Sequence, residues 1–462
     1  MSRVLRISLL LAAMVTSGCG PDPWLDQPPV TLELPLTTQV LANGLTVVLV
    51  PNHAAPLITA VLAVRAGSDV EDASNNGYSH LFEHMIFQGS QAVPDASAFR
   101  DRLDALGASR NATTGVDRVT YFFTAQSSQA DEALGLFAGA LQQPRLASAS
   151  LDKERQVVIG EFDLNESNFG FVRQRRLFQL LLGESVYRFD PLGSRDVVRE
   201  VSAERLEQAH ATYYVPNNAL LVLSGDLTVA QGTELAQRHF GSWSEREDPA
   251  LDAPAAPLPA LVDGEQAVIE APISATEIEL AWRGPTEADD PEGALAGALL
   301  SSVTYQGDHI FRGLVGADGA FSATFAVYSA RNLGVVRVQL SIPPGLERAV
   351  LQRLARVLKE MEAGGALDAM QLEAAKDRMF RGHLFSSSDP AQLPQLLADH
   401  WGKSSLERFQ TFEDALYDID GAAIRRFARR YLRGTPRVAV VMSSAQNIAS
   451  GELDALLDEE SK

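Results

Sequence analysis

Two histidines and a glutamate fall within five residues in the first half of the chain, in the segment His80-Leu81-Phe82-Glu83-His84. On a helix, positions i, i+3 and i+4 share one face, with neighbouring Cβ atoms about 5–6 Å apart. Two imidazoles one turn apart can both reach one Zn²⁺ at about 2.0–2.1 Å. A carboxylate between them can take a proton from the attacking water and pass it to a leaving amine. The segment therefore predicts a hydrolytic zinc site with Glu83 as its base.

A catalytic zinc site needs a third protein ligand, and a pair of acidic residues further along the chain offers one. Glu154 and Glu161 are seven residues apart, so two helical turns would place them on the same face. One could bind the metal while the other orients a ligand or the substrate amine. The periodicity does not choose between them. Without the histidine segment, both would be read as solvated glutamates on a charged helix.

The elements that must position these residues alternate between strands and helices. In the first half the patterns predict strands over 45–50, 57–64, 120–125 and 219–223, and helices over 96–106, 130–141, 151–164 and 229–240. Asn75-Asn76-Gly77 interrupts the chain just before a helix that begins near Tyr78 and carries the histidines.

The same kind of pattern starts again in the second half, with strands over 277–282, 335–342 and 438–442 and helices over 291–303 and 347–362. Between the halves, 246–262 carries several prolines and no periodicity, as linkers do. We therefore expect an α+β chain of two similar α/β modules of about 200 residues each. Their expected bounds are 31–245 and 263–450, followed by an acidic tail over 451–462.

The composition excludes some classes of function. The chain has 462 residues, 39 basic and 59 acidic, and a formal net charge of −20. Its 46 % hydrophobic content is that of an ordinary globular protein. The negative charge argues against sequence-independent binding of nucleic acid, because phosphates repel it. No uninterrupted apolar stretch is long enough to predict a transmembrane helix in the mature chain.

The single cysteine, Cys19, rules out an intrachain disulfide and a cysteine-based zinc site. Two arginines and the apolar run 7–15 precede it, and small residues stand just before it. This arrangement resembles the lipobox of bacterial lipoproteins, with Thr16 where leucine is usual. The resemblance implies that a signal peptide, 1–18, is removed and that Cys19 is acylated. A plain secretory signal with a free cysteine is the alternative.

A lipid on Cys19 would anchor the chain to a membrane, since each buried CH₂ contributes about 0.8 kcal/mol. The proline-rich segment 19–30 is expected to be an extended tether. Gly20 stands where an aspartate would signal retention in the inner membrane, so the resemblance favours the outer membrane, facing the periplasm.

Together these motifs resemble the pitrilysin family of zinc peptidases, the inverzincins, which includes insulin-degrading enzyme and the mitochondrial processing peptidase. The resemblance rests on residues 41–45, 65–68, 77–90, 154–161, 213–218 and 225–226. In this family 76 residues separate the second histidine from the third ligand, and 76 residues lie between His84 and Glu161. The resemblance therefore implies Glu161 as the ligand and Glu154 as a supporting carboxylate at the catalytic site.

The resemblance also implies a fold and an assembly. Each module would be an antiparallel-rich sheet with helices on one face, and four modules would enclose a chamber. This chain supplies two, so a dimer is expected. The stretch 111–114 matches the edge strand to which the substrate backbone adds, which would place Asn111 against the peptide. An asparagine in a turn is an almost equally good interpretation.

The second half departs from the family pattern. The family uses an arginine and, seven residues later, a tyrosine to hold the substrate and stabilise oxyanion charge. Val315 and Ser322 stand at those positions here, while Arg312 and Tyr328 are out of register. The resemblance includes heterodimers in which one subunit carries zinc and the other the Arg/Tyr pair. We expect this chain to be the zinc-bearing subunit of such a pair.

Three functions remain open on the sequence alone. The first is a zinc endopeptidase that acts on peptides or unfolded segments small enough to enter a chamber. The second is a non-catalytic membrane-tethered scaffold or peptide-binding subunit, which the missing Arg/Tyr pair favours and Glu83 disfavours. The third is a metal-carrying binding protein of the envelope, which fits the lipobox but not the spacing between His84 and Glu161.

Overall fold

The computed structural model describes residues 2–8, 31–188, 190–246, 249, 258–261, 264–304, 310–365 and 367–449. Cys19, the tether over 19–30, most of the linker over 246–262 and the tail over 451–462 lie outside the described residues. Within the described ranges, no helix combines the length and the apolar character needed to cross a bilayer.

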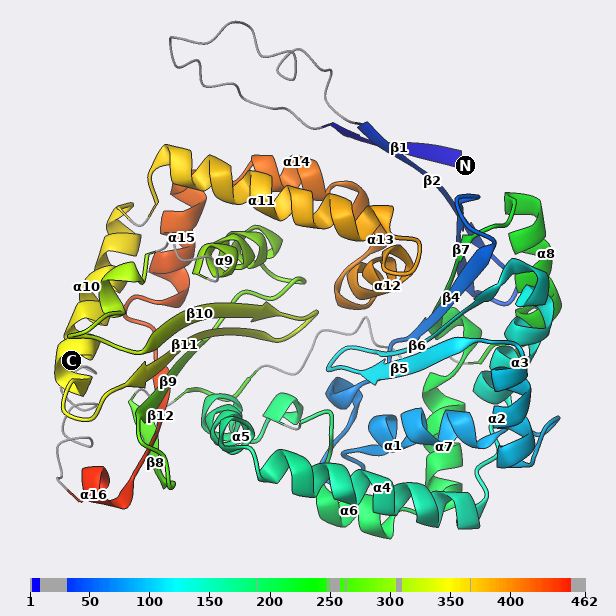
Figure 1. The fold of residues 1–462 in the computed structure, drawn as a ribbon, viewed down its shortest axis with the longest axis horizontal. Coiled ribbons are helices and arrows are strands. Elements are labelled where there is room, and N and C mark those ends of the chain that lie inside the picture. Colours follow the sequence, from blue (N-terminus) through cyan, green and yellow to red (C-terminus); the bar gives the residue numbers. More distant parts are fainter. Residues whose placement is uncertain are drawn as a thin grey trace, which may run out of the picture.

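The first half is built on a seven-stranded sheet, in which all neighbours are antiparallel except the parallel pair β3 and β7. Its strands, in spatial order, are β1 (Ser2–Ser8), β2 (Thr31–Val40), β3 (Thr46–Pro51), β7 (Ala219–Gly225), β4 (Leu57–Val64), β6 (Val119–Gln126) and β5 (Ser109–Thr114). Strand β1 falls inside the segment expected to be a signal peptide. Strand β5 forms the edge nearest the second half (Figure 1).

Eight α-helices belong to this half in the described ranges. They are α1 (Tyr78–Met85), α2 (Ala96–Ala105), α3 (Ala130–Gln142), α4 (Ser148–Glu166), α5 (Phe169–Leu182), α6 (Arg195–Glu200), α7 (Ala203–Tyr213) and α8 (Val229–Phe240). Short 3₁₀ turns connect them at Ser68–Val70 (η1), Ile86–Gln88 (η2), Ser127–Gln129 (η3), Val186–Arg188 (η4) and Pro216–Asn218 (η5).

The second half has a five-stranded sheet in the order β10 (Ser322–Ser329), β11 (Gly334–Ile342), β9 (Thr276–Arg283), β12 (Arg437–Ser443) and β8 (Glu265–Glu270). Only β12 and β8 run parallel. Its helices are α9 (Pro291–Thr304), α10 (Glu347–Ala363), α11 (Ala369–Ser388), α12 (Leu393–Lys403), α13 (Leu406–Gln410), α14 (Phe412–Tyr417), α15 (Gly421–Tyr431) and α16 (Ala445–Ile448), with a 3₁₀ turn at Arg312–Leu314 (η6).

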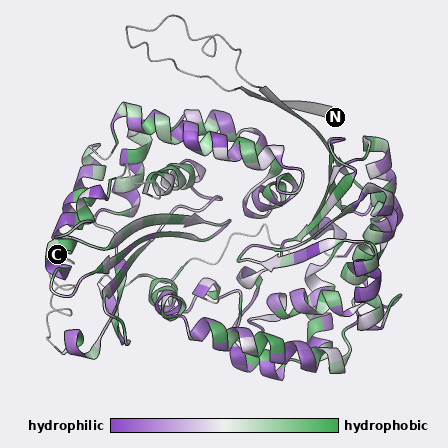
Figure 2. Cartoon of the chain, viewed as in Figure 1, coloured by the Kyte–Doolittle hydropathy of each residue, from purple (hydrophilic) through white to green (hydrophobic). Residues whose placement is uncertain are grey.

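The expectation of two mixed α/β modules is confirmed, and several predicted elements match closely. Strand β4 and helix α8 have the predicted bounds, and α10 extends the predicted helix by one residue. The central strands of both sheets are mostly hydrophobic in Figure 2, whereas the surrounding helices carry both hydrophobic and hydrophilic residues. The predicted arrangement, with helices on one face of each sheet, is incomplete, because helices cover both faces of each sheet.

Each half lends a helix to the sheet of the other half (Figure 1). One face of the first sheet packs under its own helices. On the opposite face, β4 and β7, with Val61 and Val222, pack against α12 of the second half, and Val48 of β3 belongs to the same buried cluster. In return, α5 of the first half packs on β9, β12 and β8. Leu177 and Leu181 of α5 share a buried cluster with strands of the second sheet. The two modules are therefore joined by exchange of helices as well as by the linker.

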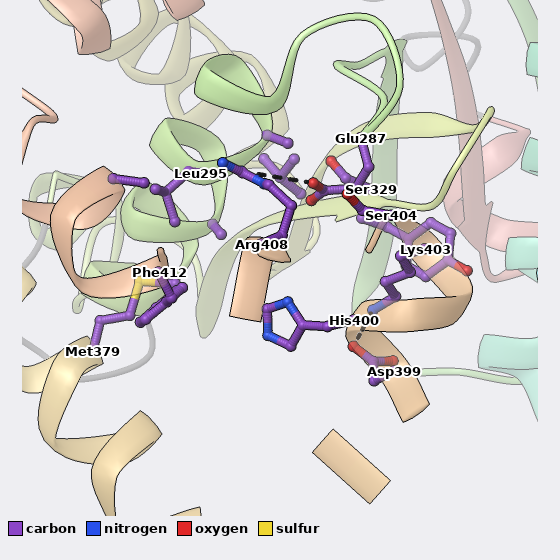
Figure 3. A pocket seen from close by; sticks show the side chains of 15 residues that line it. Glu287, Leu295, Ser329, Met379, Asp399, His400, Lys403, Ser404, Arg408 and Phe412 are labelled. Carbon is purple, nitrogen blue, oxygen red and sulfur yellow. Dashed lines mark ion pairs between the residues drawn. The ribbon is translucent and has the colours of Figure 1, made fainter. Parts of the chain in front are cut away.

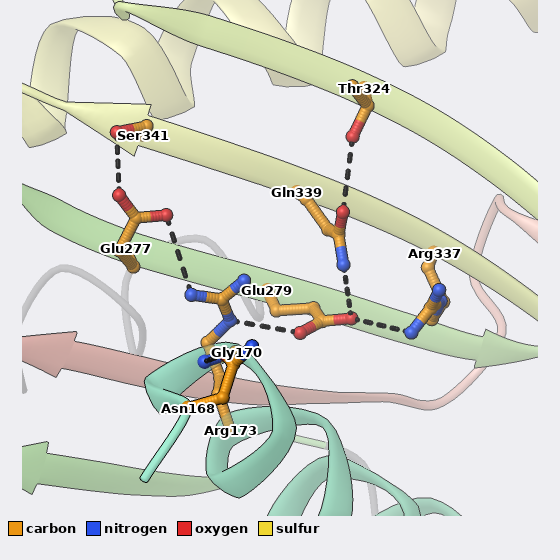
Figure 4. Close-up of polar contacts among 9 residues, drawn as sticks. All are labelled: Asn168, Gly170, Arg173, Glu277, Glu279, Thr324, Arg337, Gln339 and Ser341. Carbon is orange, nitrogen blue, oxygen red and sulfur yellow. Dashed lines mark hydrogen bonds and ion pairs between the residues drawn. The ribbon is translucent and has the colours of Figure 1, made fainter. Parts of the chain in front are cut away.

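Charged residues fix both exchanged helices. Arg173 of α5 donates from Nε to Glu279 at 3.0 Å and lies 3.4 Å from Glu277 (Figure 4). Glu279 is fully buried on β9 and also accepts from Arg337 and Gln339. Three donors, two of them from charged guanidinium groups, thus compensate a carboxylate that would otherwise be costly to bury. At the other exchange, Arg118 of the first half pairs with Asp399 of α12.

The start of α1 is held by a residue outside the helix. Gly77 precedes α1 with φ of 107°, a conformation that glycine adopts readily. A Cβ there would stand 3.0 Å from Val198 and 3.1 Å from Gly193. The buried carboxylate of Glu71 accepts from the backbone N–H of Gly77 at 2.8 Å and of Ser79 at 2.7 Å. Glu71 therefore supplies acceptors that the first turn of a helix lacks.

Replacing Glu71 with alanine is expected to lower the free energy of unfolding by about 1–3 kcal/mol, because two N–H groups at the start of α1 lose their acceptor. Urea denaturation of the metal-free protein measures this change. Glu200→Ala, at an exposed position, is the matched control. Equal unfolding free energies for the two variants would contradict this role of Glu71.

Candidate metal centre

Helices α1 and α4 bring three potential metal ligands together. Nε2 of His80 lies 3.4 Å from one carboxylate oxygen of Glu161, and Nε2 of His84 lies 3.5 Å from the other. One ligand atom from each of the three residues lies within 4.8 Å of the others. Ligands at about 2.0–2.1 Å in a tetrahedral site are about 3.3 Å apart. The donor set and its spacing therefore fit a single Zn²⁺ ion.

The rest of α1 holds the two histidines in place. Leu81, Phe82 and Met85 are buried in the core of the first half, so His80 and His84 project from the opposite side of the helix. The ring of Phe82 lies 4.9 Å from that of His210 and 4.4 Å from that of Tyr214. This packing fixes the rotation of α1 about its axis, and with it the direction in which the imidazoles point.

Glu154 and Glu161 lie at opposite nitrogens of His84, Glu154 at Nδ1 and Glu161 at Nε2. Oε2 of Glu154 is 3.3 Å from Nδ1 of His84, and its Oε1 accepts from Gln88 at 2.9 Å. A carboxylate on Nδ1 leaves Nε2 unprotonated and free to bind a metal. The structure thus separates the two glutamates that periodicity left equivalent. Glu161 faces both imidazoles, and Glu154 orients one of them.

Glu83 shares the face of α1 that carries the histidines. Its Oε2 accepts a hydrogen bond of 2.5 Å from the hydroxyl of Thr114, at the end of edge strand β5. Burial raises the pKa of Glu83, and the charge of Glu161 adds to the increase, while Thr114 and His84 oppose it. A carboxylate with a raised pKa is a better proton acceptor near neutral pH.

The two histidines have different electrostatic surroundings. Burial, and to a lesser extent the nearby His84, lower the pKa of His80 to about 4, although the backbone of Leu192 acts in the opposite direction. Burial alone would lower the pKa of His84, but the hydrogen bond that its Nδ1 donates to Glu154 and the charges of Glu161, Glu154 and Glu83 outweigh burial and raise it overall. His80 is therefore neutral at physiological pH, as a metal ligand must be.

Asn111 lies at an exposed position of β5, the strand whose outer edge has no partner among the described strands. Its side-chain oxygen accepts from the N–H of Ala112 at 2.9 Å. The structure brings this strand beside the metal centre through Thr114, not through Asn111. A contact between Asn111 and a peptide therefore stays a prediction.

The stretch of the second half that departs from the family pattern carries no arginine or tyrosine at the two expected places. Val315 follows η6 and is 41 % exposed. Ser322 begins β10 and is also exposed. Neither side chain can donate a charged hydrogen bond to a substrate.

Sequence reasoning missed three residues of this centre: Glu71, Gln88 and the role of Thr114. Gln88 and Thr114 belong to segments that carry the family resemblance, so the sequence could indicate that they lie near the site. Their contacts with Glu154 and Glu83 join residues 66 and 31 positions apart, and spacing along one helix cannot reveal such pairs.

Comparison with known proteins agrees with this geometry. Residues 46–195 match the model of insulinase (peptidase family M16), and residues 200–379 match that of the peptidase M16 inactive domain. The chain is 25 % identical to zinc protease PqqE of Helicobacter pylori, over 87 % of this chain and 91 % of that protein. It is also 25 % identical to the β subunit of the mitochondrial processing peptidase of Saccharomyces cerevisiae, over 54 % of each protein.

A solved structure shows the same fold. The crystal structure of a protease from Helicobacter pylori superposes with a TM-score of 0.77, covers 89 % of this chain and all of that one, and is 21 % identical in sequence. The family models, the relatives and the clustered ligands agree with one another. The chain therefore belongs to the insulinase family, peptidase family M16, and is a two-module zinc protease with His80, His84 and Glu161 placed to bind the metal.

Proposed function

We propose that this chain is the zinc-bearing subunit of a heterodimeric endopeptidase that cleaves peptides or unfolded polypeptide segments in an enclosed chamber. The observation that carries the proposal is the position of Glu83. It lies on the same helix face as two metal ligands and is hydrogen-bonded to the edge strand of the sheet. A purely structural metal site has no need of such a carboxylate.

Each residue has a defined part in the proposed reaction. When bound by His80, His84 and Glu161, zinc supplies a Lewis acid that polarises the scissile carbonyl and acidifies water. Glu83 accepts the proton of the attacking water on its carboxylate and delivers it to the nitrogen of the leaving amine. Glu154 holds His84 in the required tautomer. Strand β5 pairs with the backbone of an extended peptide.

The heterodimer is proposed because Val315 and Ser322 stand where the family pattern has the arginine and the tyrosine. Val315 and Ser322 can neither bind an anionic group by charge nor supply a phenol. A homologous partner subunit would contribute those groups to the same chamber. We further propose that acylated Cys19 tethers the complex to the outer membrane, facing the periplasm.

Glu83→Gln is expected to reduce kcat for a fluorogenic peptide by at least 10³-fold, because the amide cannot accept the proton. Zinc content, measured by atomic absorption, should stay at one ion per chain. The control is Asp163→Asn, an exposed change on α4. An active Glu83→Gln enzyme would contradict the assignment of the base.

Glu154→Gln is expected to weaken zinc binding about 10–100-fold, because His84 loses the carboxylate that orients it. Competition with a chromogenic chelator measures the affinity. Asp152→Asn, an exposed position on the same helix, should leave it unchanged. If both variants bind zinc as the wild type does, Glu154 has no part in positioning His84.

The partner can be tested by adding a homologue that lacks the zinc motif and keeps the arginine and tyrosine. Peptide cleavage by the mixture is expected to exceed that of this chain alone by at least tenfold, since the added pair stabilises oxyanion charge. Full activity of the chain alone would exclude the heterodimer. Absence of cleavage in every combination would favour a non-catalytic peptide-binding subunit.

A further inference from the structure

The second half contains a cavity that is separate from the metal centre. Its volume is about 280 Å³, and it lies among α9, β10, α11, α12, α13 and α14 (Figure 3). The cavity has two chemically different sides. In Figure 3, Leu295, Met379 and Phe412 lie on one side, and Glu287, Ser404 and Lys403 lie on the other.

Arg408 and Glu287 form an ion pair without a hydrogen bond in the wall of this cavity. The guanidinium of Arg408 lies 3.8 Å from the carboxylate of Glu287, beyond hydrogen-bonding distance, and donates to the carbonyl of Pro291 at 3.3 Å. Both side chains are partly exposed, 29 % and 21 % respectively. Arg408 has five donors, and most of them have no acceptor among the described residues. The pair therefore retains the capacity to bind one anionic and one cationic group.

The second ion pair in the wall, Lys403 with Asp399, is fully compensated within the protein. Lys403 lies 3.0 Å from Asp399, and Arg118 of the first half pairs with the same carboxylate. Two cations thus compensate Asp399, which leaves little need for a ligand there. His400 lies between the two pairs along the wall, and neither of its ring nitrogens is hydrogen-bonded to a described residue. It can accept or donate one further hydrogen bond.

The apolar side of the cavity is formed by Leu295, Ala298, Val327, Met379 and Phe412. The volume of the whole cavity, about 280 Å³, is just below the range of about 300–1,000 Å³ that is typical for drug-sized ligands. A small molecule with an apolar part and two opposite charges matches both the size of the cavity and the division of its lining.

We propose that this cavity binds a small zwitterion with an apolar side chain, either a free amino acid or a dipeptide. Its ammonium lies against Glu287, its carboxylate against Arg408, and its side chain among Leu295, Met379 and Phe412. Burial raises the pKa of Glu287, which is the mark of a carboxylate whose charge is incompletely compensated. A ligand ammonium would supply the missing compensation.

The cavity also touches the interface between the halves. His400, Asp399 and Lys403 all belong to α12, the helix that covers the first sheet. A ligand in the cavity would therefore contact the same helix that joins the two modules.

Isothermal titration calorimetry on the zinc-loaded chain tests the proposal. L-leucine, L-phenylalanine and the dipeptide Leu-Leu are the probes. N-acetyl-L-leucine lacks the ammonium, and L-leucinamide lacks the carboxylate. We expect saturable binding of the zwitterions and at least tenfold weaker binding of both blocked compounds. Tighter binding of leucine would identify a free amino acid as the ligand, and tighter binding of Leu-Leu would identify a dipeptide.

Two variants and one control locate the binding. Arg408→Gln removes the anion partner, and Ala298→Leu fills the apolar side. Each should weaken binding at least tenfold. Arg356→Gln, an exposed change on α10, should leave it unchanged. The inactive Glu83→Gln protein should still bind, so failure of the peptidase proposal is distinguishable from failure of this one.

Three results would overturn the proposal. The first is a lack of binding of all three zwitterions at millimolar concentration. The second is equal binding of leucine and N-acetyl-leucine, which requires no variant and so does not depend on the folding of one. The third is binding that survives Ala298→Leu, because a ligand at the zinc centre would behave in that way.

Discussion

Both sheets of this protein are covered by helices on both faces, and this constraint shapes the rest of the molecule. Each half covers only one face of its own sheet, so the opposite face must be covered from elsewhere. The exchange of α5 and α12 meets that need, and Arg173 on Glu279 and Arg118 on Asp399 fix the two exchanged helices. The two modules therefore hold each other in a set arrangement.

The metal centre is connected to this arrangement. Helix α4, which carries Glu154 and Glu161, leads within three residues into α5, whose place is set by the second sheet. Helix α1 is placed by the core of the first half and by Glu71 at its start. Leu151, Val158 and Phe162 of α4 lie in the same core as α1, so the first half itself brings the third ligand to the two histidines. Helix α5 then ties this arrangement to the second sheet.

Much of this could be predicted from the sequence where the signal is local. The strand at 57–64 and the helix at 229–240 have clear periodicity. The spacing of His80, Glu83 and His84 by itself predicts zinc binding and a catalytic base. The choice of Glu161 over Glu154 came from a family spacing and not from the helix pattern. The positions of α5 and α12 could not be predicted, because an amphipathic helix shows that it covers a sheet but not which sheet. Contacts such as Thr114 with Glu83 and Glu71 with Gly77 likewise depend on the folded topology.

The exchange of helices has a consequence for biosynthesis. The strands that carry Val48, Val61 and Val222 leave the ribosome long before α12 is made, since that helix begins only at Leu393. During that interval one apolar face of a seven-stranded sheet lacks its cover. Such a surface is a target for aggregation until synthesis is nearly complete. The nascent first half thus depends on chaperones that shield hydrophobic strands, or on translation fast enough to close the gap.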